Sequence, residues 1–255
     1  MPEIRLAARQ FNYEKQPAIK SKGTIILIHG SGGTAQVWRE QMKGLSQDRD
    51  CISIDLPGHG NSAPPVCSSV SEAASLLKSF IANLSIQRPL YLVGHSLGAA
   101  IALHYARYFA EDLNGFILVG GGSKLKVLPQ VLEGLAKGQM NDAFARITFS
   151  SKSDPALVEA EVNVYMQNSP AVLYADLNAC NEFNLTDELA FINLPALLIV
   201  GRDDVLTPVK YAEYLYTHLS NASLEIITAA GHFAMLENPA AVNKAIIEFI
   251  KKIEA

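Results

Sequence analysis

The sequence predicts an α/β protein built on a doubly wound, mostly parallel sheet. Short runs rich in Ile, Leu and Val recur along the chain, and segments with the 3.6-residue periodicity of helices alternate with them. The chain has 255 residues, of which 49% are hydrophobic, so it is long enough to bury one large core. Strands and helices that alternate around one core imply right-handed crossover connections.

Six apolar runs are the candidate strands. Each is short and ends in Gly, Asp or His, which is typical of strands that are buried on both faces of a parallel sheet. The runs are "TIILIHG" from Thr24, "CISIDLPG" from Cys51, "PLYLVGHS" from Pro89, "LNGFILVGGG" from Leu113, "LPALLIVGRDD" from Leu194 and "ASLEIITAAGH" from Ala222.

Four segments have the periodicity of helices with one apolar face. They are Val70 to Ile86, Leu97 to Phe109, Val209 to Leu219 and Pro239 to Ile253. Pro208 and Pro239 stand where the first turn of a helix accepts proline, because that turn needs no backbone N–H donor.

One stretch interrupts the alternation. No strand-like run occurs between Gly122 and Thr186. Two segments there, "SDPALVEAEVNVYMQN" and "SPAVLYADLNACNEF", begin with a Ser or Asp cap followed by proline, which indicates a helix start. We therefore expect residues 123–185 to form an all-helical insertion that packs as a lid on a core made of residues 1–122 and 186–255.

Charge and composition narrow the range of partners. The formal net charge is -4 and no basic run occurs, so nucleic acid is not an expected partner. No apolar run is long enough to span a bilayer, and the N-terminal residues lack the apolar core of a signal peptide, so we expect a cytoplasmic protein with no membrane partner.

The three cysteines are too widely spaced for a disulfide framework or a zinc cluster, and we expect no metal and no cofactor. The oligomeric state is left open.

The segment Gly94-His95-Ser96-Leu97-Gly98 joins a candidate strand directly to a candidate helix and matches the pattern G-x-S-x-G. A sharp turn there forces the serine into strained backbone angles, and the glycines leave room for the close approach of strand and helix. Ser96 then lies at the start of a helix, where the N–H of Leu97 and the helix dipole stabilise an oxyanion. Ser96 is the candidate nucleophile.

A serine nucleophile needs a base, and His232 is the candidate. It follows the last strand and precedes the last helix, at the edge of the sheet where the strands end. The other histidines have different expected roles: His104 and His218 lie in helices, His29 and His59 make structural backbone hydrogen bonds in tight loops, and His95 points away from the direction of Ser96.

A third group must orient the imidazole, and the loop after "LPALLIV" supplies Asp203 and Asp204. Adjacent acids point in different directions, so one of them orients His232. The other, with Arg202, is expected to be a solvated or salt-bridged loop charge. The comparable loop at residues 120–123 contains no carboxylate.

The loop from His29 to Gly33 offers a second oxyanion donor, a backbone N–H near Ser31. The same loop supports a competing interpretation, because Gly30-x-Gly32-x-x-Ala35 followed by Asp55 imitates a dinucleotide-binding fingerprint. A serine hydrolase needs a serine at one strand end, an acid at another and a histidine after the last strand. A dinucleotide-binding oxidoreductase needs none of the three. These groups favour the hydrolase.

Together these residues resemble the α/β-hydrolase superfamily over nearly the whole chain. The resembling segments are "HGSGGTAQVW" from His29, "DLPGHGNS" from Asp55, "GHSLG" from Gly94, "GRDDVLTP" from Gly201 and "GHFAMLENP" from Gly231. The resemblance implies the α/β-hydrolase fold with a helical lid inserted after the sixth strand. It implies Ser96 as nucleophile, Asp204 as orienting acid, His232 as base, and oxyanion N–H groups at Ser31 and Leu97. Asp55, His59 and Ser62 are expected to shape the fold and are assigned no chemistry.

The expected activity is that of a serine carboxylesterase, which hydrolyses small uncharged carboxylic esters through an acyl-enzyme on Ser96. A serine at this turn argues against haloalkane dehalogenases and epoxide hydrolases, which use aspartate. Carbon-carbon bond hydrolases often carry tryptophans just after the final histidine, where this chain has Phe233, Met235 and Leu236. The alternatives are such a carbon-carbon bond hydrolase, an acyltransferase or a lyase on the same triad, or a binding protein that senses a small ligand.

Overall fold

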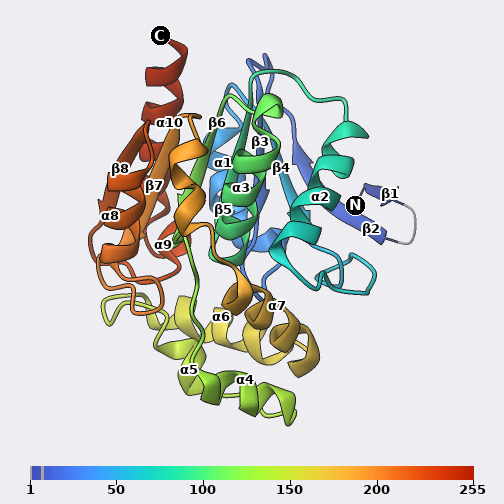
Figure 1. Ribbon diagram of the computed structural model, residues 1–255, viewed down its shortest axis with the longest axis vertical. Coiled ribbons are helices and arrows are strands. Elements are labelled where there is room, and N and C mark those ends of the chain that lie inside the picture. Colours follow the sequence, from blue (N-terminus) through green and yellow to red (C-terminus); the bar gives the residue numbers. More distant parts are fainter. Residues whose placement is uncertain (1, 7–8) are drawn as a thin grey trace.

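The computed structural model describes residues 2–6 and 9–255, and its centre is an eight-stranded sheet (Figure 1). The strand order is β1-β2-β4-β3-β5-β6-β7-β8, and β3 to β8 all run parallel. The strands are β1 (Glu3–Leu6), β2 (Arg9–Gln16), β3 (Thr24–Ile28), β4 (Asp50–Asp55), β5 (Leu90–His95), β6 (Gly115–Val119), β7 (Ala196–Gly201) and β8 (Ala222–Ile227). Each of the six apolar runs forms a strand, and the predicted fold class is confirmed.

The sequence patterns did not predict the antiparallel strands β1 and β2 at the edge of the sheet. The sequence of β2, "RQFNYEKQ", is mostly polar, yet Phe11 is fully buried and Tyr13 packs beside it. A strand that covers a core with one face needs only alternate apolar residues, so it lacks the continuous apolar run of a strand that is buried on both faces.

Helices cover both faces of the sheet, because successive strand side chains point to opposite faces. In β3, Ile26 and Ile28 pack in the core cluster that includes α2, α3 and α8, whereas Ile25 and Leu27 pack in the one that includes α1, α9 and α10 (Figure 1). These helices are α1 (Arg39–Leu45), α2 (Val70–Ala82), α3 (Leu97–Tyr108), α8 (Val209–His218), α9 (Ala234–Glu237) and α10 (Pro239–Glu254). Short 3-10 turns are η1 (Ala35–Trp38), η2 (Ala110–Asp112) and η3 (Thr186–Phe191).

Four helices lie between β6 and β7, gathered at one end of the sheet (Figure 1, yellow-green to yellow). They are α4 (Pro129–Ala136), α5 (Asp142–Arg146), α6 (Pro155–Met166) and α7 (Pro170–Glu182). The expected caps are present: Asp154 accepts a hydrogen bond from Ala156 N, and Ser169 accepts one from Ala171 N. We call residues 123–185 the insertion. Among the described helices, none has both the length and the apolar character needed to cross a bilayer.

Candidate active site

Ser96 occupies the tight turn between β5 and α3, with φ 52° and ψ -112°. This positive φ is strained for a residue with a side chain. The flanking glycines allow the turn: a Cβ on Gly94 would lie 2.0 Å from Gly98 O, and a Cβ on Gly98 would lie 2.3 Å from Ile28 O. The turn therefore has the backbone geometry that the G-x-S-x-G pattern predicts.

His232 and Asp204 meet at the ends of β8 and β7. His232 Nδ1 and Asp204 Oδ2 are 2.8 Å apart, and both residues are buried. The loop of Asp204 supplies further donors: Leu206 N and Thr207 N both bond to Oδ1, and Thr207 Oγ1 donates to Oδ2. A carboxylate acceptor at Nδ1 fixes the proton on that nitrogen and leaves the Nε2 lone pair free to act as a base.

The environment of Asp204 favours its ionised form. Burial alone would raise the pKa of this carboxyl group, but the charge of His232 and hydrogen bonds from His232 and Thr207 lower the pKa to about 2. Asp204 is thus the acid of the 203–204 pair whose carboxylate bonds to the His232 imidazole. A buried anion in this position can stabilise an imidazolium ring.

Ser96 and His232 line the same two cavities, with volumes of about 80 Å³ and 240 Å³. Within the described residues no hydrogen bond joins Ser96 Oγ to the His232 ring. Such bonds are often long in a ligand-free enzyme and tighten with the substrate. The structure thus brings Ser96 and His232 to one site. Asp204 bonds to Nδ1 of His232 and leaves Nε2 without a bond to that acid.

The two expected oxyanion donors also lie at this site. Ser31 lines the smaller cavity together with Ser96. A Cβ on Gly30 would lie 3.0 Å from Ser96 Cβ, so the Gly30–Gly33 loop passes directly beside the serine. In the described part of the chain, neither Ser31 N–H nor Leu97 N–H donates a hydrogen bond to another residue. Both donors are available to a ligand.

The remaining loop histidines divide into three kinds of role. His29 Nδ1 donates to Gly30 O and its Nε2 accepts from Leu56 N, as expected for a structural histidine, and burial and the charge of His59 lower its pKa to about 3. His59 pairs with Asp176 at 2.8 Å, a partner that the sequence did not indicate. His95, which is expected to point away from the direction of Ser96, packs its ring beside that of His232, with 4.7 Å between the ring centres, and its Nε2 donates to His232 O.

Asp203 differs from its expected role as a solvated or salt-bridged charge. It accepts a hydrogen bond of 2.6 Å from Ser150 Oγ in the insertion. Nearby, His232 N donates to Thr148 O at 2.7 Å, and Glu237 accepts from Gly231 N and Ser150 N. The insertion thus contacts the loop of Asp203 and Asp204 and the loop of His232. Sequence patterns gave no signal for these contacts, because they join segments that are far apart in the chain.

Asp55 has a structural position that does not fit the dinucleotide interpretation. Its two carboxylate oxygens accept hydrogen bonds from Ala35 N at 2.7 Å and Asn61 N at 2.9 Å. Its side chain is buried, and Ser62 Oγ donates to its carbonyl oxygen. The carboxylate is therefore engaged in holding its own loops together, as expected from the resemblance.

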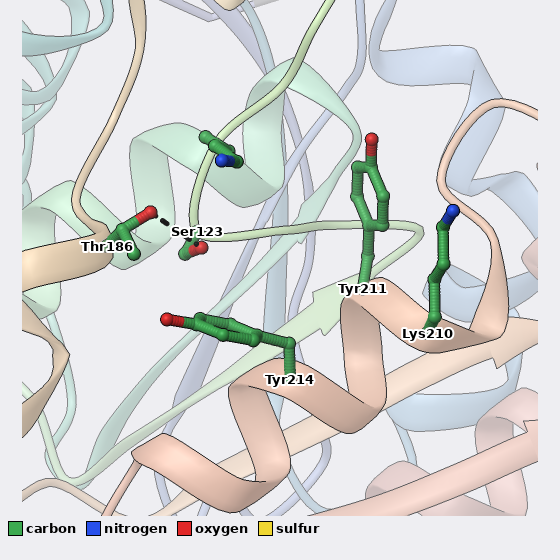
Figure 2. Close-up of a pocket in the computed structure, with 6 residues that line it drawn as sticks. Ser123, Thr186, Lys210, Tyr211 and Tyr214 are labelled. Atoms are coloured by element: carbon green, nitrogen blue, oxygen red, sulfur yellow. Dashed lines mark hydrogen bonds between the residues drawn. The ribbon is translucent and has the colours of Figure 1, made fainter.

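A further cavity of about 280 Å³ lies where the insertion joins the core (Figure 2). It is lined by Ser123, Lys124, Thr186, Lys210, Tyr211 and Tyr214. Figure 2 shows the Ser123 and Thr186 hydroxyl groups paired, at 3.1 Å, across the two connecting segments, with Tyr214 turned toward them from α8. None of Ser96, Asp204 and His232 lines this cavity, so it is separate from the candidate active site.

Comparison with known proteins identifies the family. Pimeloyl-(acyl-carrier protein) methyl ester esterase of Vibrio vulnificus is 27% identical over 246 residues, which cover 89% of this chain and 94% of that protein. A solved thermophilic esterase is 30% identical with a TM-score of 0.84, covering 99% of this chain and 97% of that chain. A lipase-esterase related protein from Clostridium acetobutylicum is 28% identical with a TM-score of 0.84, covering 94% and 99%.

The names of these proteins agree with the expected enzyme class, a carboxylic ester hydrolase. A family model described as "Alpha/beta hydrolase family" matches residues 25–245. That match spans the parallel strands and the insertion, and it includes Ser96, Asp204 and His232. The chain belongs to the alpha/beta hydrolase family.

Proposed function

We propose that the protein is a serine carboxylesterase that hydrolyses small uncharged carboxylic esters through an acyl-enzyme on Ser96. The observation that carries the proposal is the Asp204–His232 hydrogen bond beside two cavities that both Ser96 and His232 line. The names of the relatives, which are esterases, support the reaction class.

In the first half-reaction, His232 Nε2 takes the Ser96 proton as Oγ attacks the ester carbonyl carbon. The oxygen of the tetrahedral intermediate accepts hydrogen bonds from the N–H groups of Ser31 and Leu97. The bond to the leaving oxygen then breaks, His232 protonates the departing alcohol, and the acyl group remains on Ser96. Water repeats the sequence on the acyl-enzyme and releases the carboxylic acid.

The cavities favour an ester with one short and one longer substituent, because Ser96 lines both a cavity of about 80 Å³ and one of about 240 Å³. Phe144, Phe149 and Leu177 of the insertion contribute apolar lining. The Glu161 carboxylate also lines the smaller cavity, but Arg39 pairs with it at 3.0 Å and offsets its charge. The lining of the smaller cavity therefore favours an uncharged substituent.

Residues 123–185 act in this proposal as the lid over the site. The two segments that connect them to the core lie together: Leu185 N donates to Ser123 O at 2.8 Å, and Lys124 and Asn184 form an isolated β-bridge. Both chain crossings between the insertion and the core therefore lie side by side.

A series of p-nitrophenyl esters of increasing acyl length tests the proposal. We expect turnover that peaks at a short acyl chain, and covalent labelling of the protein by a fluorophosphonate. The variant Ser96→Ala should lose both, whereas Ser151→Ala, which changes an exposed serine of the insertion, should keep both. Normal ester turnover in Ser96→Ala would refute the proposal.

The same assay distinguishes the alternative functions. Competing alcohols reveal acyl transfer, and tight ligand binding without turnover would favour a binding protein.

A further inference from the structure

The Gly30–Gly33 loop, which carries the proposed oxyanion donor Ser31 N–H, is held from two sides. On the core side, Gly30 O accepts hydrogen bonds from Gly33 N at 3.0 Å and from His29 Nδ1 at 2.8 Å. Gly30 C=O and Ser31 N–H belong to one planar trans peptide and point in opposite directions. The core therefore orients the peptide group that contains the donor.

On the other side, the insertion holds the next residue, Gly32. Gly32 N–H donates to Asp176 Oδ2 at 2.8 Å, and Gly32 O accepts from Asn168 Nδ2 at 2.9 Å. Asp176 is in α7, and Asn168 lies just before that helix. The N–H and C=O groups of Gly32 are thus both hydrogen-bonded to side chains in α7 or just before it.

The backbone at Gly32 depends on these contacts. Gly32 has φ +64°, the left-handed conformation of the third residue in a type II turn. Rotation of the Ser31–Gly32 peptide would convert this turn to another type, and the bond to Asp176 opposes that rotation. A Cβ at Gly32 would lie 2.4 Å from Leu173 Cδ2, so α7 also packs tightly against the turn.

The charge of Asp176 is balanced inside the protein. Asp176 is 3% exposed, and its carboxylate pairs with His59 Nε2 at 2.8 Å. His59 Nδ1 faces Pro57 O at 3.2 Å, so both ring nitrogens face acceptors, which favours the imidazolium form of the ring. A lone carboxylate here would repel the negative charge that develops on the substrate oxygen, and the imidazolium offsets that repulsion.

We propose that Asp176, assisted by Asn168, is a positioning residue for the oxyanion hole, so that docking of α7 on the core holds Ser31 N–H in its working direction. This inference rests on the proposed function. Asp176 does not touch the reacting atoms. Asp176 acts through Gly32, because its carboxylate accepts the hydrogen bond of Gly32 N–H. Ser31 N–H is left available to the substrate oxygen.

The test compares two variants of matched shape. Asp176→Leu keeps the outline of the side chain and removes the acceptor, whereas Asp176→Asn keeps an acceptor for Gly32 N–H. Since loss of a whole oxyanion donor costs about 10² to 10³ in kcat, a misdirected donor in Asp176→Leu should cost about 10- to 100-fold with KM nearly unchanged. Asp176→Asn should remain within about fivefold of the natural protein.

Two measurements separate positioning from loss of folded protein. Fluorophosphonate titration of Ser96 counts competent sites, so kcat is expressed per site. The inhibition constant of a trifluoromethyl ketone, which forms a tetrahedral adduct with a serine, should rise in step with the loss of kcat/KM. The control is Asp154→Ala, which removes the cap of α6 without touching Gly32, and its kcat should stay within about twofold.

A folded Asp176→Leu with unchanged kcat per site would overturn the inference, as would an equal loss in Asp154→Ala. If Asp176→Leu does not fold, Asn168→Ala makes the same test through Gly32 O, with an expected loss of about three- to tenfold in kcat. Failure of the proposed function is a different result, because the natural protein would then show no Ser96-dependent turnover.

Discussion

The sheet core and the insertion are held in different ways. Central strand residues such as Ile26, Leu92 and Phe116 are completely buried, and apolar packing on both faces fixes the strands. The insertion exposes several large apolar side chains: Ile147, Val164, Met166 and Tyr174. Directional polar contacts join it to the loops of the site, including Asp176 to Gly32 and Ser150 to Asp203. Apolar packing therefore builds the scaffold and also takes in Cys180 and Phe183 of the insertion, while hydrogen bonds tie the insertion to the groups proposed for catalysis.

The largest expected effect belongs to a residue on the core side. His232→Ala should lower kcat for p-nitrophenyl acetate by about 10⁵ to 10⁶, because the serine then has no base and triad members act as a unit. The measurement is steady-state kinetics with thermal unfolding to confirm the fold. The double variant Ser96→Ala/His232→Ala should have almost the same kcat as either single variant. A much lower kcat in the double variant would show that the two residues act separately.

The adjacent acids sharpen the comparison, since Asp204 bonds to His232 and Asp203 bonds to the insertion. Asp204→Asn should lower kcat by roughly 10⁴, because an amide no longer fixes the tautomer of His232. Asp203→Asn should lower it by less than about tenfold, because only a contact to Ser150 weakens. Equal losses in the two variants, measured side by side, would remove Asp204 from the triad.

Stability should respond most to the core. Leu103→Ala in α3, where the leucine is completely buried, should lower the free energy of unfolding by about 2 to 5 kcal/mol, because a cavity remains. Val164→Ala on the exposed side of α6 should change it by less than about 0.5 kcal/mol. Urea denaturation measures both, and a similar loss in the two variants would mean that the insertion is packed as tightly as the core.

The smallest expected effect is a pH dependence at the joint between core and insertion. Burial alone would lower the pKa of His59, but the hydrogen bond and charge of Asp176 raise it above 6.5, with a contribution from Asp55. His29, which packs against His59, and Cys67, which lines a small cavity with it, are further titratable groups near His59. A raised pKa in the folded state gives stability that is fully present below pH 6.5 and is lost as the pH rises through the folded value.

The variant His59→Gln should therefore differ most from the natural protein in Tm near pH 6, and the difference should narrow as the pH rises toward 9. Thermal unfolding across this pH range is the measurement. A difference that is constant with pH would show that the His59–Asp176 pair carries no charge-dependent stability.

Much of the scaffold could be predicted because its determinants are local in the chain. The run ending at Gly94, the glycine spacing around Ser96 and the proline at position 155 each act within one turn or strand. Strand β2 was not predicted, since only Phe11 and Tyr13 mark its buried face. Asp176 gave no signal at all: in the sequence it is one polar residue on a helix, and its partners are 117 and 144 positions away.

The sequence by itself determined the alternation of strands and helices, the sharp turn at Ser96 and the order in which serine, acid and histidine occur, because periodicity and glycine placement act over a few residues. The family resemblance already implied Asp204 as the acid that reaches His232. The tertiary structure alone revealed that Asp203 bonds to Ser150 of the insertion and that α7 contacts the Ser31–Gly32 turn. Those choices depend on distances between segments that are remote in the chain, and hydrogen bonds discriminate among them over tenths of an ångström.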